Sequence, residues 1–256
     1  MASTQTTRDR TGLDDTPPVL HTELFEFPEF STFPQVRRYF SSVIFDFDGT
    51  LADSLWVWDD IDLRFCEIYD LTVPDDYYEK IDAMTFEETA VYFIEELGLD
   101  MPAEEILYHF NEMAYDRYAH EVKLLPGVKE YLELLKTRGV TMGIATSLTW
   151  PLLEAAMKNN GIDGYFDDIA FCDESASKEK PDVYLLTAER IGARPEDCIV
   201  FEDAPSGITS ARNAGMAACQ VVDKRRTALP TGQADGADFW IEDFAGLAKG
   251  AEKALL

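Results

Sequence analysis

Two aspartates with one residue between them, Asp46 and Asp48, directly follow a short apolar run at residues 43–45. This β-branched and aromatic run predicts a strand buried on both faces, and α/β folds bind their ligands at the carboxyl ends of such strands. Two carboxylates this close repel each other, so they need a cation or a shared proton. Mg²⁺ suits both hard carboxylate oxygens and phosphate. The alternative is a strand end with a simple turn at Asp48 and Gly49, and this stretch alone does not decide between the two.

Polar residues that could bind a ligand or take part in a reaction follow two more predicted strands. Thr146 and Ser147 follow one of them, and Glu202 and Asp203 follow the other. The carboxyl ends of parallel strands lie on the same edge of a sheet, so these side chains are expected to meet Asp46 there. Acidic strand ends that face each other predict a site for a hard divalent cation.

A transferring phosphoryl group also needs a fixed cation that balances its negative charge. Lys178 and Lys180 lie just before a helix that is predicted to begin at Pro181 and Asp182, and either lysine could reach the site. A lysine at such a position is ordinarily solvated. The residues alone therefore leave open which lysine, if either, lies at the site.

From residue 124 onward, predicted helices alternate with predicted strands, which is typical of a parallel sheet covered by helices on both faces. Residues 224–256 are polar and are predicted to form loops, with a helix at about residues 243–256. The other predicted helices are residues 128–138, 152–158, 182–191 and 206–214, and the predicted strands are residues 43–45, 140–145, 168–172, 198–201 and 217–222.

Residues 54–123 carry apolar residues at helical spacing in three runs, with no convincing strand. Thr85, with Glu88 three residues later, has the spacing of a capping box at the start of the second run. A block of helices directly after the first strand interrupts the alternation and predicts a separate module. The predicted organisation is a partly disordered N-terminal extension at residues 1–40, an α/β core at residues 41–54 and 124–256, and an α-helical cap at residues 55–123.

The chain of 256 residues is strongly acidic, because 22 Lys and Arg stand against 49 Asp and Glu and give a formal net charge of −27. Such a surface repels nucleic acid and anionic membranes, so neither is expected as a partner. No apolar run is long enough to span a membrane and no signal-peptide pattern is present, so a cytoplasmic location is expected. The four cysteines have no CxxC spacing and predict buried free thiols.

Four motifs, in this order, resemble those of the haloacid dehalogenase (HAD) superfamily over roughly residues 41–222. They are Asp-Phe-Asp-Gly-Thr-Leu-Ala-Asp-Ser at residues 46–54, Gly-Ile-Ala-Thr-Ser at residues 143–147, Lys178 with Pro181 and Asp182, and Phe-Glu-Asp-Ala-Pro-Ser-Gly-Ile at residues 201–208. The helical insert resembles the cap of the β-phosphoglucomutase-like and phosphoglycolate-phosphatase-like subgroup. The resemblance implies an α/β fold with a Rossmann-like parallel sheet core and an inserted α-helical cap domain.

The resemblance also implies roles for the residues that match the motifs. Asp46 would be the nucleophile that takes the phosphoryl group as an aspartyl-phosphate, and Asp48 would be the general acid and later the base. Thr146 would bind a phosphoryl oxygen, and Lys178 would bridge the nucleophile and the phosphate. A metal and a lysine are needed because both the nucleophile and the substrate are anions.

Mg²⁺ is the cofactor that the resemblance implies. The Asp46 carboxylate, the Asp48 backbone carbonyl and the Asp203 carboxylate would hold it, with Glu202 as a direct or water-mediated ligand.

The third motif departs from the family pattern of Gly-Lys-Pro-x-Pro-Asp, since residues 177–182 read Ser-Lys-Glu-Lys-Pro-Asp. An alignment on Pro181 and Asp182 selects Lys178, and its spacing to the fourth motif also fits the family. An alignment on a bare Lys-Pro selects Lys180. We favour Lys178 and keep Lys180 as the alternative.

The family resemblance implies a Mg²⁺-dependent phosphatase that hydrolyses a small phosphorylated metabolite, such as a sugar phosphate. Dehalogenases of the family lack the second aspartate, so Asp48 argues against their reaction. The β-phosphoglucomutase-like members carry a histidine in the first cap helix where this chain has Trp58, which favours hydrolysis over a mutase reaction. A sugar phosphomutase and a non-catalytic HAD-fold binding or scaffold protein are the alternatives.

Substrate contacts are predicted at Ser54, Trp58 and Thr85 on the cap side and at Ser147 on the core side. Trp56 and Trp58 cannot both point from one helical face, so one of them is expected at the substrate. Acidic residues dominate the cap, which favours a neutral or weakly charged leaving group over a bisphosphate. A monomer or a weak homodimer is expected.

Overall fold

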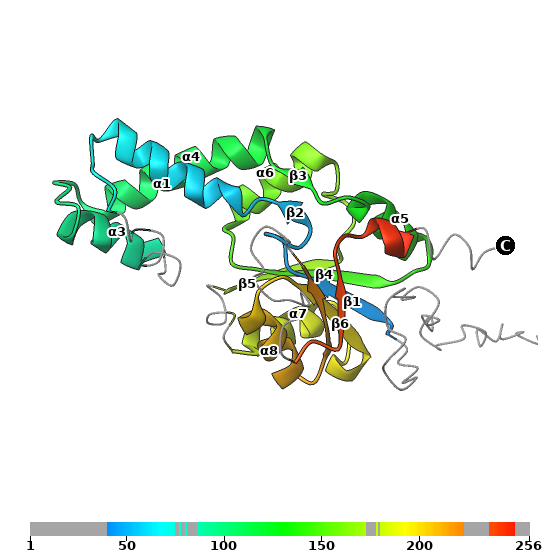
Figure 1. Cartoon of the computed structure of the whole chain (residues 1–256). Helices are drawn as coiled ribbons and strands as arrows, with labels where there is room; N and C mark the ends of the chain where they lie inside the picture. Colours follow the sequence, from blue (N-terminus) through cyan, green and yellow to red (C-terminus); the bar gives the residue numbers. More distant parts are fainter. Residues whose placement is uncertain are drawn as a thin grey trace, which may run out of the picture.

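The computed structural model describes residues 40–74, 77, 80, 86–172, 178, 180–222 and 236–248. Its centre is a six-stranded parallel sheet with the strand order β5-β4-β1-β6-β7-β8, which confirms the predicted α/β core (Figure 1). The strands are β1 (Ser42–Phe45), β4 (Thr141–Thr146), β5 (Asp168–Phe171), β6 (Cys198–Glu202), β7 (Ala217–Val221) and β8 (Phe239–Ile241). The first strand therefore lies inside the sheet, with a neighbour on each side.

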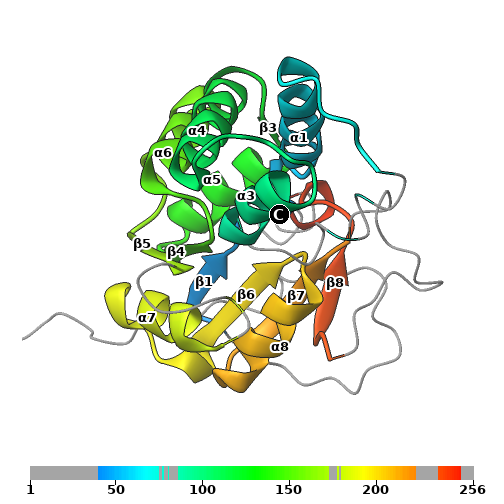
Figure 2. The ribbon, with the colours of Figure 1, turned by 90° about the vertical axis from the view of Figure 1, so that its left-hand side faces the viewer.

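Helices cover both faces of the sheet, as predicted. One face carries α5 and α6, and the opposite face carries α7 and α8 (Figure 1, and from the side in Figure 2). A 3₁₀ turn at Pro195–Asp197 leads into β6. The helices are α5 (Val128–Thr137), α6 (Trp150–Asn160), α7 (Asp182–Arg190) and α8 (Pro205–Asn213).

The side chains of β1 alternate between two hydrophobic clusters, one on each face of the sheet. Val43 and Phe45 belong to the larger cluster and Ile44 to the smaller one, and all three are fully buried. The Phe45 ring stacks on Phe201 of β6 at 5.3 Å between centroids. An apolar residue is therefore required at each of these three positions, and each such burial stabilises the fold by about 1.5–3 kcal/mol.

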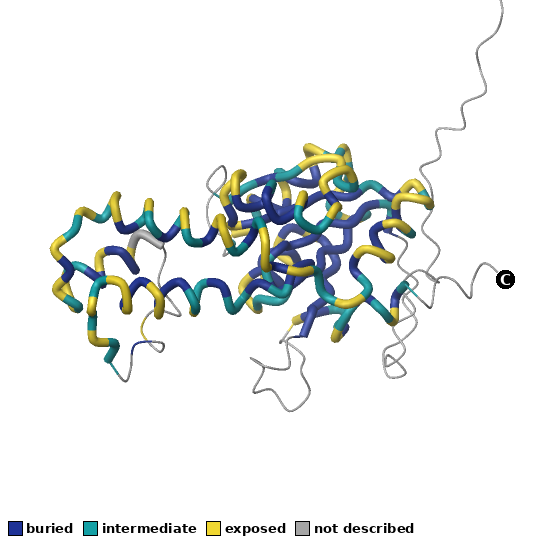
Figure 3. The backbone as a smooth tube through the Cα atoms, turned by 90° about the horizontal axis from the view of Figure 1, so that it is seen from above, coloured by how far each residue is buried: buried dark blue, intermediate teal, exposed yellow. Residues whose placement is uncertain are grey.

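Between the first strand and the rest of the core, where the sequence predicts a helical cap, the described residues include three helices: α1 (Trp56–Ile68), α3 (Phe86–Glu95) and α4 (Ala103–His120). Each contributes a phenylalanine to an edge-to-face cluster, in which Phe65 lies 5.2 Å from Phe93 and 4.8 Å from Phe110 between ring centroids. Figure 3 shows the cap extending from the core, with buried and exposed residues alternating along it as on helices with one apolar face.

The chain enters and leaves the cap at one place. The short strands β2 (Ala52–Asp53) and β3 (Lys123–Leu124) pair antiparallel, so the two links lie side by side. Beyond this pair, α4 packs along α6 of the core. The exact domain boundaries stay a prediction, but α4 touches the core and the cap alike.

The prediction of loops after residue 224 is wrong at one point, because β8 adds a sixth strand at the sheet edge. Asp238 fixes its start, since its backbone N–H donates to the carbonyl of Ala218 (2.9 Å) and its carboxylate accepts from the N–H of Ala218 (3.0 Å). Three residues are too few for a recognisable alternation. The two-residue strands β2 and β3 were missed for the same reason.

Several expectations fall outside the described residues. These are the N-terminal extension up to residue 39, Thr85 of the predicted capping box, and all but the first turn of the predicted C-terminal helix, of which residues 245–248 are helical. None of the described helices combines the length and apolar character that a membrane span requires. The prediction of free thiols is confirmed, with Cys66, Cys198 and Cys219 buried and Cys172 half-buried.

Candidate active site

The three predicted strand ends meet at one edge of the sheet. Phe45 of β1 lies in register with Ile144 of β4 and with Phe201 of β6. The backbone N–H of Asp46 donates to the carbonyl of Phe201 (3.0 Å). The chain therefore stays paired with β6 for one residue beyond the end of β1. Thr146 ends β4 one strand away. The prediction that these chain segments converge is confirmed.

Two glycines leave room for the carboxylates of Glu202 at the end of β6 and of Asp203 directly after it. Gly49 adopts a φ of +75°, and a Cβ there would lie 2.4 Å from an oxygen of Asp203. A Cβ on Gly207, in the first turn of α8, would lie 2.0 Å from an oxygen of Glu202. Any other residue at either position would displace an acid of the site, and a side chain at position 49 would also strain the backbone.

Three carboxylates form a compact acidic cluster. Ligand oxygens of Asp46, Glu202 and Asp203 all lie within 4.8 Å of one another. The Lys178 ammonium binds Asp46 Oδ1 and lies 3.1 Å from Glu202 Oε1. Lys180 is exposed. Among the described residues, one ammonium group therefore faces three carboxylates, so negative charge remains to be neutralised.

Because burial disfavours charge and carboxylates outnumber the ammonium group, the pKa values of two of the carboxyl groups are raised. Burial and the neighbouring Glu202 raise the pKa of Asp46 to about 8, although Lys178 offsets part of the effect. Burial, Glu202 and Asp46 raise the pKa of Asp203 to about 9. Burial alone would lower the pKa of Lys178, but Asp46 and Glu202 hold it well above its usual value, so this lysine stays charged. Hard oxygen donors with uncompensated charge fit Mg²⁺.

The side chain of Asp48 has partners of its own, apart from the acidic cluster. Ser54 Oγ donates to Asp48 Oδ1 at 2.5 Å, and the Tyr118 hydroxyl donates to the same oxygen at 2.6 Å. Burial raises the pKa of Asp48, and these two hydrogen bonds counteract part of that effect. The predicted metal contact of Asp48 runs through its backbone carbonyl and stays a prediction.

The residues after β4 take two different positions. Thr146 is fully buried, and its Oγ1 accepts a hydrogen bond from the backbone N–H of Leu148 (3.1 Å). Ser147 is exposed, and its hydroxyl contacts the Cys172 thiol at 3.4 Å. Binding of phosphoryl oxygen by Thr146 and of substrate by Ser147 stay predictions.

Of the residues predicted on the cap side, Ser54 contacts Asp48 directly, and Trp58 packs on Tyr118, which also contacts Asp48. Ser54 is fully buried against Asp48. Trp58 is half-buried and packs on the Tyr118 ring at 6.4 Å between centroids, whereas the Trp56 indole N–H donates to the carbonyl of Asp53 (2.9 Å). The predicted substrate contacts of Ser54 and Trp58 are therefore untested, and Thr85 lies outside the described residues.

Two tyrosines belong to the site although their spacing in the sequence did not place them there. Tyr118 bonds Asp48, and the Tyr184 hydroxyl donates to Glu202 Oε1 at 3.2 Å. Tyr118 continues the third of the apolar runs at helical spacing in residues 54–123, so its spacing indicates only an apolar contact. Its place near the end of that run, just before the chain returns to the core, was the available signal. Tyr184 lies in the first turn of α7, directly after the third motif.

The fold and the site together define a capped α/β protein with an acidic, lysine-containing centre at the carboxyl edge of its sheet. The sequence profile of the family described as haloacid dehalogenase-like hydrolase matches residues 43–221. The chain belongs to this family.

Individual relatives agree with the assignment. The chain is 30% identical over 176 residues to a phosphorylated carbohydrates phosphatase of Thermotoga maritima, covering 68% of this chain and 82% of that protein. It is 31% identical over 218 residues to protein CbbY of Rhodobacter capsulatus, covering 79% and 91%. The crystal structure of CbbY from Rhodobacter sphaeroides in complex with phosphate superposes with a TM-score of 0.71 at 23% identity, covering 83% and 99%. With several named phosphatases among its relatives, the protein is a phosphoric monoester hydrolase.

Proposed function

We propose that the protein is a Mg²⁺-dependent phosphatase that hydrolyses a sugar phosphate or a similar small phosphomonoester through an aspartyl-phosphate at Asp46. The observation that carries this proposal is the position of Asp46. It is 3% exposed, at the edge of the sheet, bound by Lys178 and next to two more carboxylates. The similarity to a phosphatase of phosphorylated carbohydrates supports the substrate class.

The proposed reaction has two steps, each a displacement at phosphorus. A carboxylate oxygen of Asp46 attacks phosphorus, the ester P–O bond breaks, and Asp48 gives its proton to the leaving oxygen. Asp48, now a carboxylate, then takes a proton from water as the water oxygen attacks phosphorus. The bond from Asp46 to phosphorus breaks, and inorganic phosphate leaves. Lys178 and Thr146 bind the phosphoryl oxygens in both steps.

Mg²⁺ would be held by the carboxylates of Asp46, Asp203 and Glu202 and by the Asp48 backbone carbonyl. When bound, it supplies positive charge that reduces the repulsion between the nucleophile and the phosphate. The raised pKa values of Asp46 and Asp203 support this assignment, because these two carboxyl groups resist being charged without a further cation.

Mg²⁺ is expected to raise the Tm of the metal-stripped protein more at about pH 8.5 than at about pH 6. The folded-state pKa values of Asp46 (about 8) and Asp203 (about 9) lie above the ordinary 3.8. Their protonation therefore stabilises the metal-free fold at low pH, and this contribution is lost as the pH rises through those values. Bound Mg²⁺ would then supply the positive charge that the protons on Asp46 and Asp203 supply at lower pH. Thermal unfolding with and without Mg²⁺ at both pH values measures the effect.

Asp203→Asn is the matched variant for this measurement, since it removes one ligand and keeps the side-chain volume. It should remove most of the Mg²⁺-dependent rise in Tm. An equal rise at both pH values that survives in Asp203→Asn would contradict the proposed metal site.

The substrate is expected to carry a single phosphate. The four basic residues of the cap are outnumbered by its acidic residues, and Arg117 is already paired with Asp60 (2.8 Å) and Glu121 (2.5 Å). On a panel of phosphorylated metabolites, monophosphates of neutral alcohols should exceed bisphosphates by about tenfold or more in kcat/KM, the discrimination that about 1.4 kcal/mol provides. Best activity on a bisphosphate would refute this expectation.

The same panel separates the alternatives. Phosphate release from p-nitrophenyl phosphate and from metabolites in the presence of Mg²⁺ is the result expected of a phosphatase. Conversion of a sugar phosphate into its isomer without phosphate release would identify a phosphomutase, and no turnover would favour a binding or scaffold protein. The cytoplasmic location and the monomer or weak homodimer remain part of the proposal.

A further inference from the structure

One oxygen of the predicted general acid accepts two hydrogen bonds from opposite ends of the cap. Asp48 Oδ1 receives the Ser54 hydroxyl (2.5 Å), where the chain enters the cap, and the Tyr118 hydroxyl (2.6 Å), where α4 returns to the core. Both donor residues are fully buried. Two short bonds to one oxygen, made without solvent, fix the orientation of a carboxyl group that must otherwise rotate freely about its last torsion.

Tyr118 is itself held from several directions. Its backbone carbonyl accepts a bond from the Asn159 side-chain amide of α6 (3.4 Å). Asn159 and Asn160 also donate to the carbonyl of Val122, each at 3.1 Å, so the last turn of α4 is fastened to the core.

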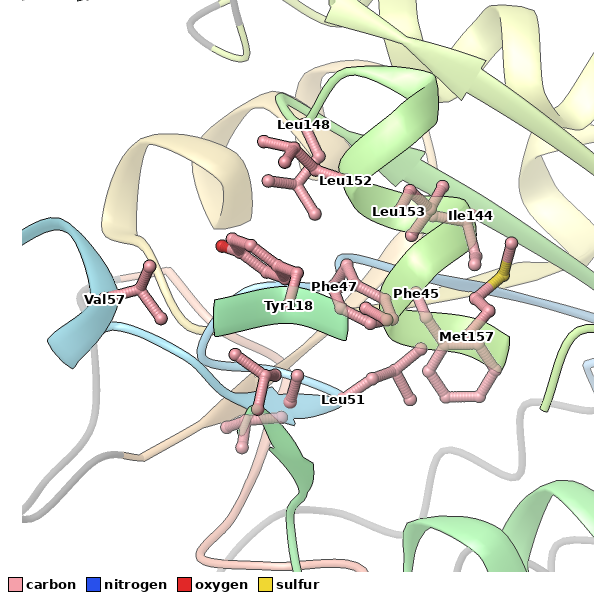
Figure 4. Close-up of a cluster of buried hydrophobic side chains, with 14 of the residues drawn as sticks. Phe45, Phe47, Leu51, Val57, Tyr118, Ile144, Leu148, Leu152, Leu153 and Met157 are labelled. Atoms are coloured by element: carbon pink, nitrogen blue, oxygen red, sulfur yellow. The ribbon is translucent and has the colours of Figure 1, made fainter. Parts of the chain in front are cut away.

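The Tyr118 ring is enclosed by side chains of the core and of the cap. Figure 4 shows it among Phe47 from the loop after β1, Val57 of α1 and Leu148 and Leu152 of the segment after β4. Its hydroxyl lies 2.6 Å from Asp48 Oδ1, and as a phenol it is a hydrogen-bond donor to the carboxylate oxygen.

These contacts determine which oxygen of Asp48 is left for chemistry. Because Oδ1 is occupied by two donors, the proton of the acid belongs on Oδ2. Building on the proposed function, we propose that Tyr118 is a positioning residue which, together with Ser54, holds Asp48 so that Oδ2 delivers its proton to the leaving oxygen of the substrate. Tyr118 acts through Asp48, the residue to which its hydroxyl donates.

The test is the dependence of Tyr118→Phe on the leaving group. An alkyl phosphate expels a strongly basic oxygen that needs a proton, whereas acetyl phosphate expels a weakly basic one that does not. In Tyr118→Phe, kcat/KM for the best alkyl phosphate of the panel should fall about 10- to 100-fold, since positioned acid catalysis contributes about 10²–10⁴-fold in total. Its kcat/KM for acetyl phosphate should change less than about threefold, within the range expected where no proton transfer is involved.

Tyr131→Phe is the matched control. Tyr131 is also fully buried, and among the described residues its hydroxyl has no hydrogen-bond partner. The loss of one hydroxyl at Tyr131 should leave kcat/KM unchanged for both the alkyl phosphate and acetyl phosphate. Ser54→Ala should repeat the pattern of Tyr118→Phe from the other side of Asp48, and it serves if Tyr118→Phe does not fold.

Several outcomes overturn the inference. An equal fall for both substrates would mean that Tyr118 only supports the fold, and no fall for either would mean that it does not position Asp48. Hydrolysis that survives Asp46→Asn would overturn the proposed function and this inference together. A proportional loss in Tyr131→Phe would show that any buried hydroxyl gives the same effect.

Discussion

Asp46→Asn is expected to lower kcat at least about 10³-fold, as is usual when the residue that forms the covalent intermediate is removed. The amide keeps the shape of the carboxylate but is too weak a nucleophile to attack phosphorus. Steady-state hydrolysis of p-nitrophenyl phosphate and of the best metabolite, both with saturating Mg²⁺, measures the loss.

The fold should survive this substitution, which separates lost chemistry from lost structure. The amide side chain of Asp46→Asn carries no charge, so the burial and the repulsion by Glu202 that raise the pKa of Asp46 no longer disfavour a charged group, while Lys178 keeps Glu202 as its partner at 3.1 Å. We therefore expect a metal-free Tm at about pH 8 no lower than that of the wild type, because a buried, disfavoured charge has been removed. Activity above about a tenth of the wild type would exclude Asp46 as the nucleophile.

Lys178→Met should lower kcat/KM about 10²–10³-fold, the usual loss on removing one preorganised group that stabilises developing charge. Methionine fills similar volume without the ammonium that binds Asp46 Oδ1. Repulsion within the acidic cluster would then rise. The substitution should affect every phosphorylated substrate alike, because Lys178 acts on the phosphoryl group and not on the leaving group.

Lys180→Met is the matched control, two residues away and of the same type. Lys180 is exposed, so its loss should change kcat/KM by less than about twofold, as for a solvated surface charge. A larger effect of Lys180→Met than of Lys178→Met would assign the phosphate-binding role to Lys180 instead.

The catalytic edge could be located from the sequence because the signal there is local. A short, continuous apolar run predicts a strand buried on both faces, and whatever follows such a strand lies at the edge of the sheet. Asp46, Thr146 and Glu202 could therefore be placed together from their positions along the chain alone. Lys178 could be favoured over Lys180 only by alignment, because two lysines two residues apart before a helix do not show by their spacing which ammonium reaches Asp46.

The partners of the second aspartate could not be predicted in the same way. Tyr118 lies 70 residues from Asp48, and its spacing on the helix is that of an apolar contact. Its hydroxyl reaches Asp48 because α4 packs on α6, and two asparagines of α6 bind the end of α4. Contacts of this kind depend on how two helices meet, which residue spacing within either helix does not contain. The strand β8 was hidden for a different reason, its length of three residues.

The most direct test of the central claim is to catch the phosphoryl group on the protein. The Mg²⁺-loaded enzyme is mixed with excess substrate, quenched in acid within the first turnovers, digested and sequenced by mass spectrometry. We predict one phosphoryl group per chain on Asp46, removed by hydroxylamine as an acyl phosphate and absent from Asp46→Asn. Label on Asp48 or another residue, or rapid turnover with no labelled protein at any quench time, would contradict the proposed mechanism.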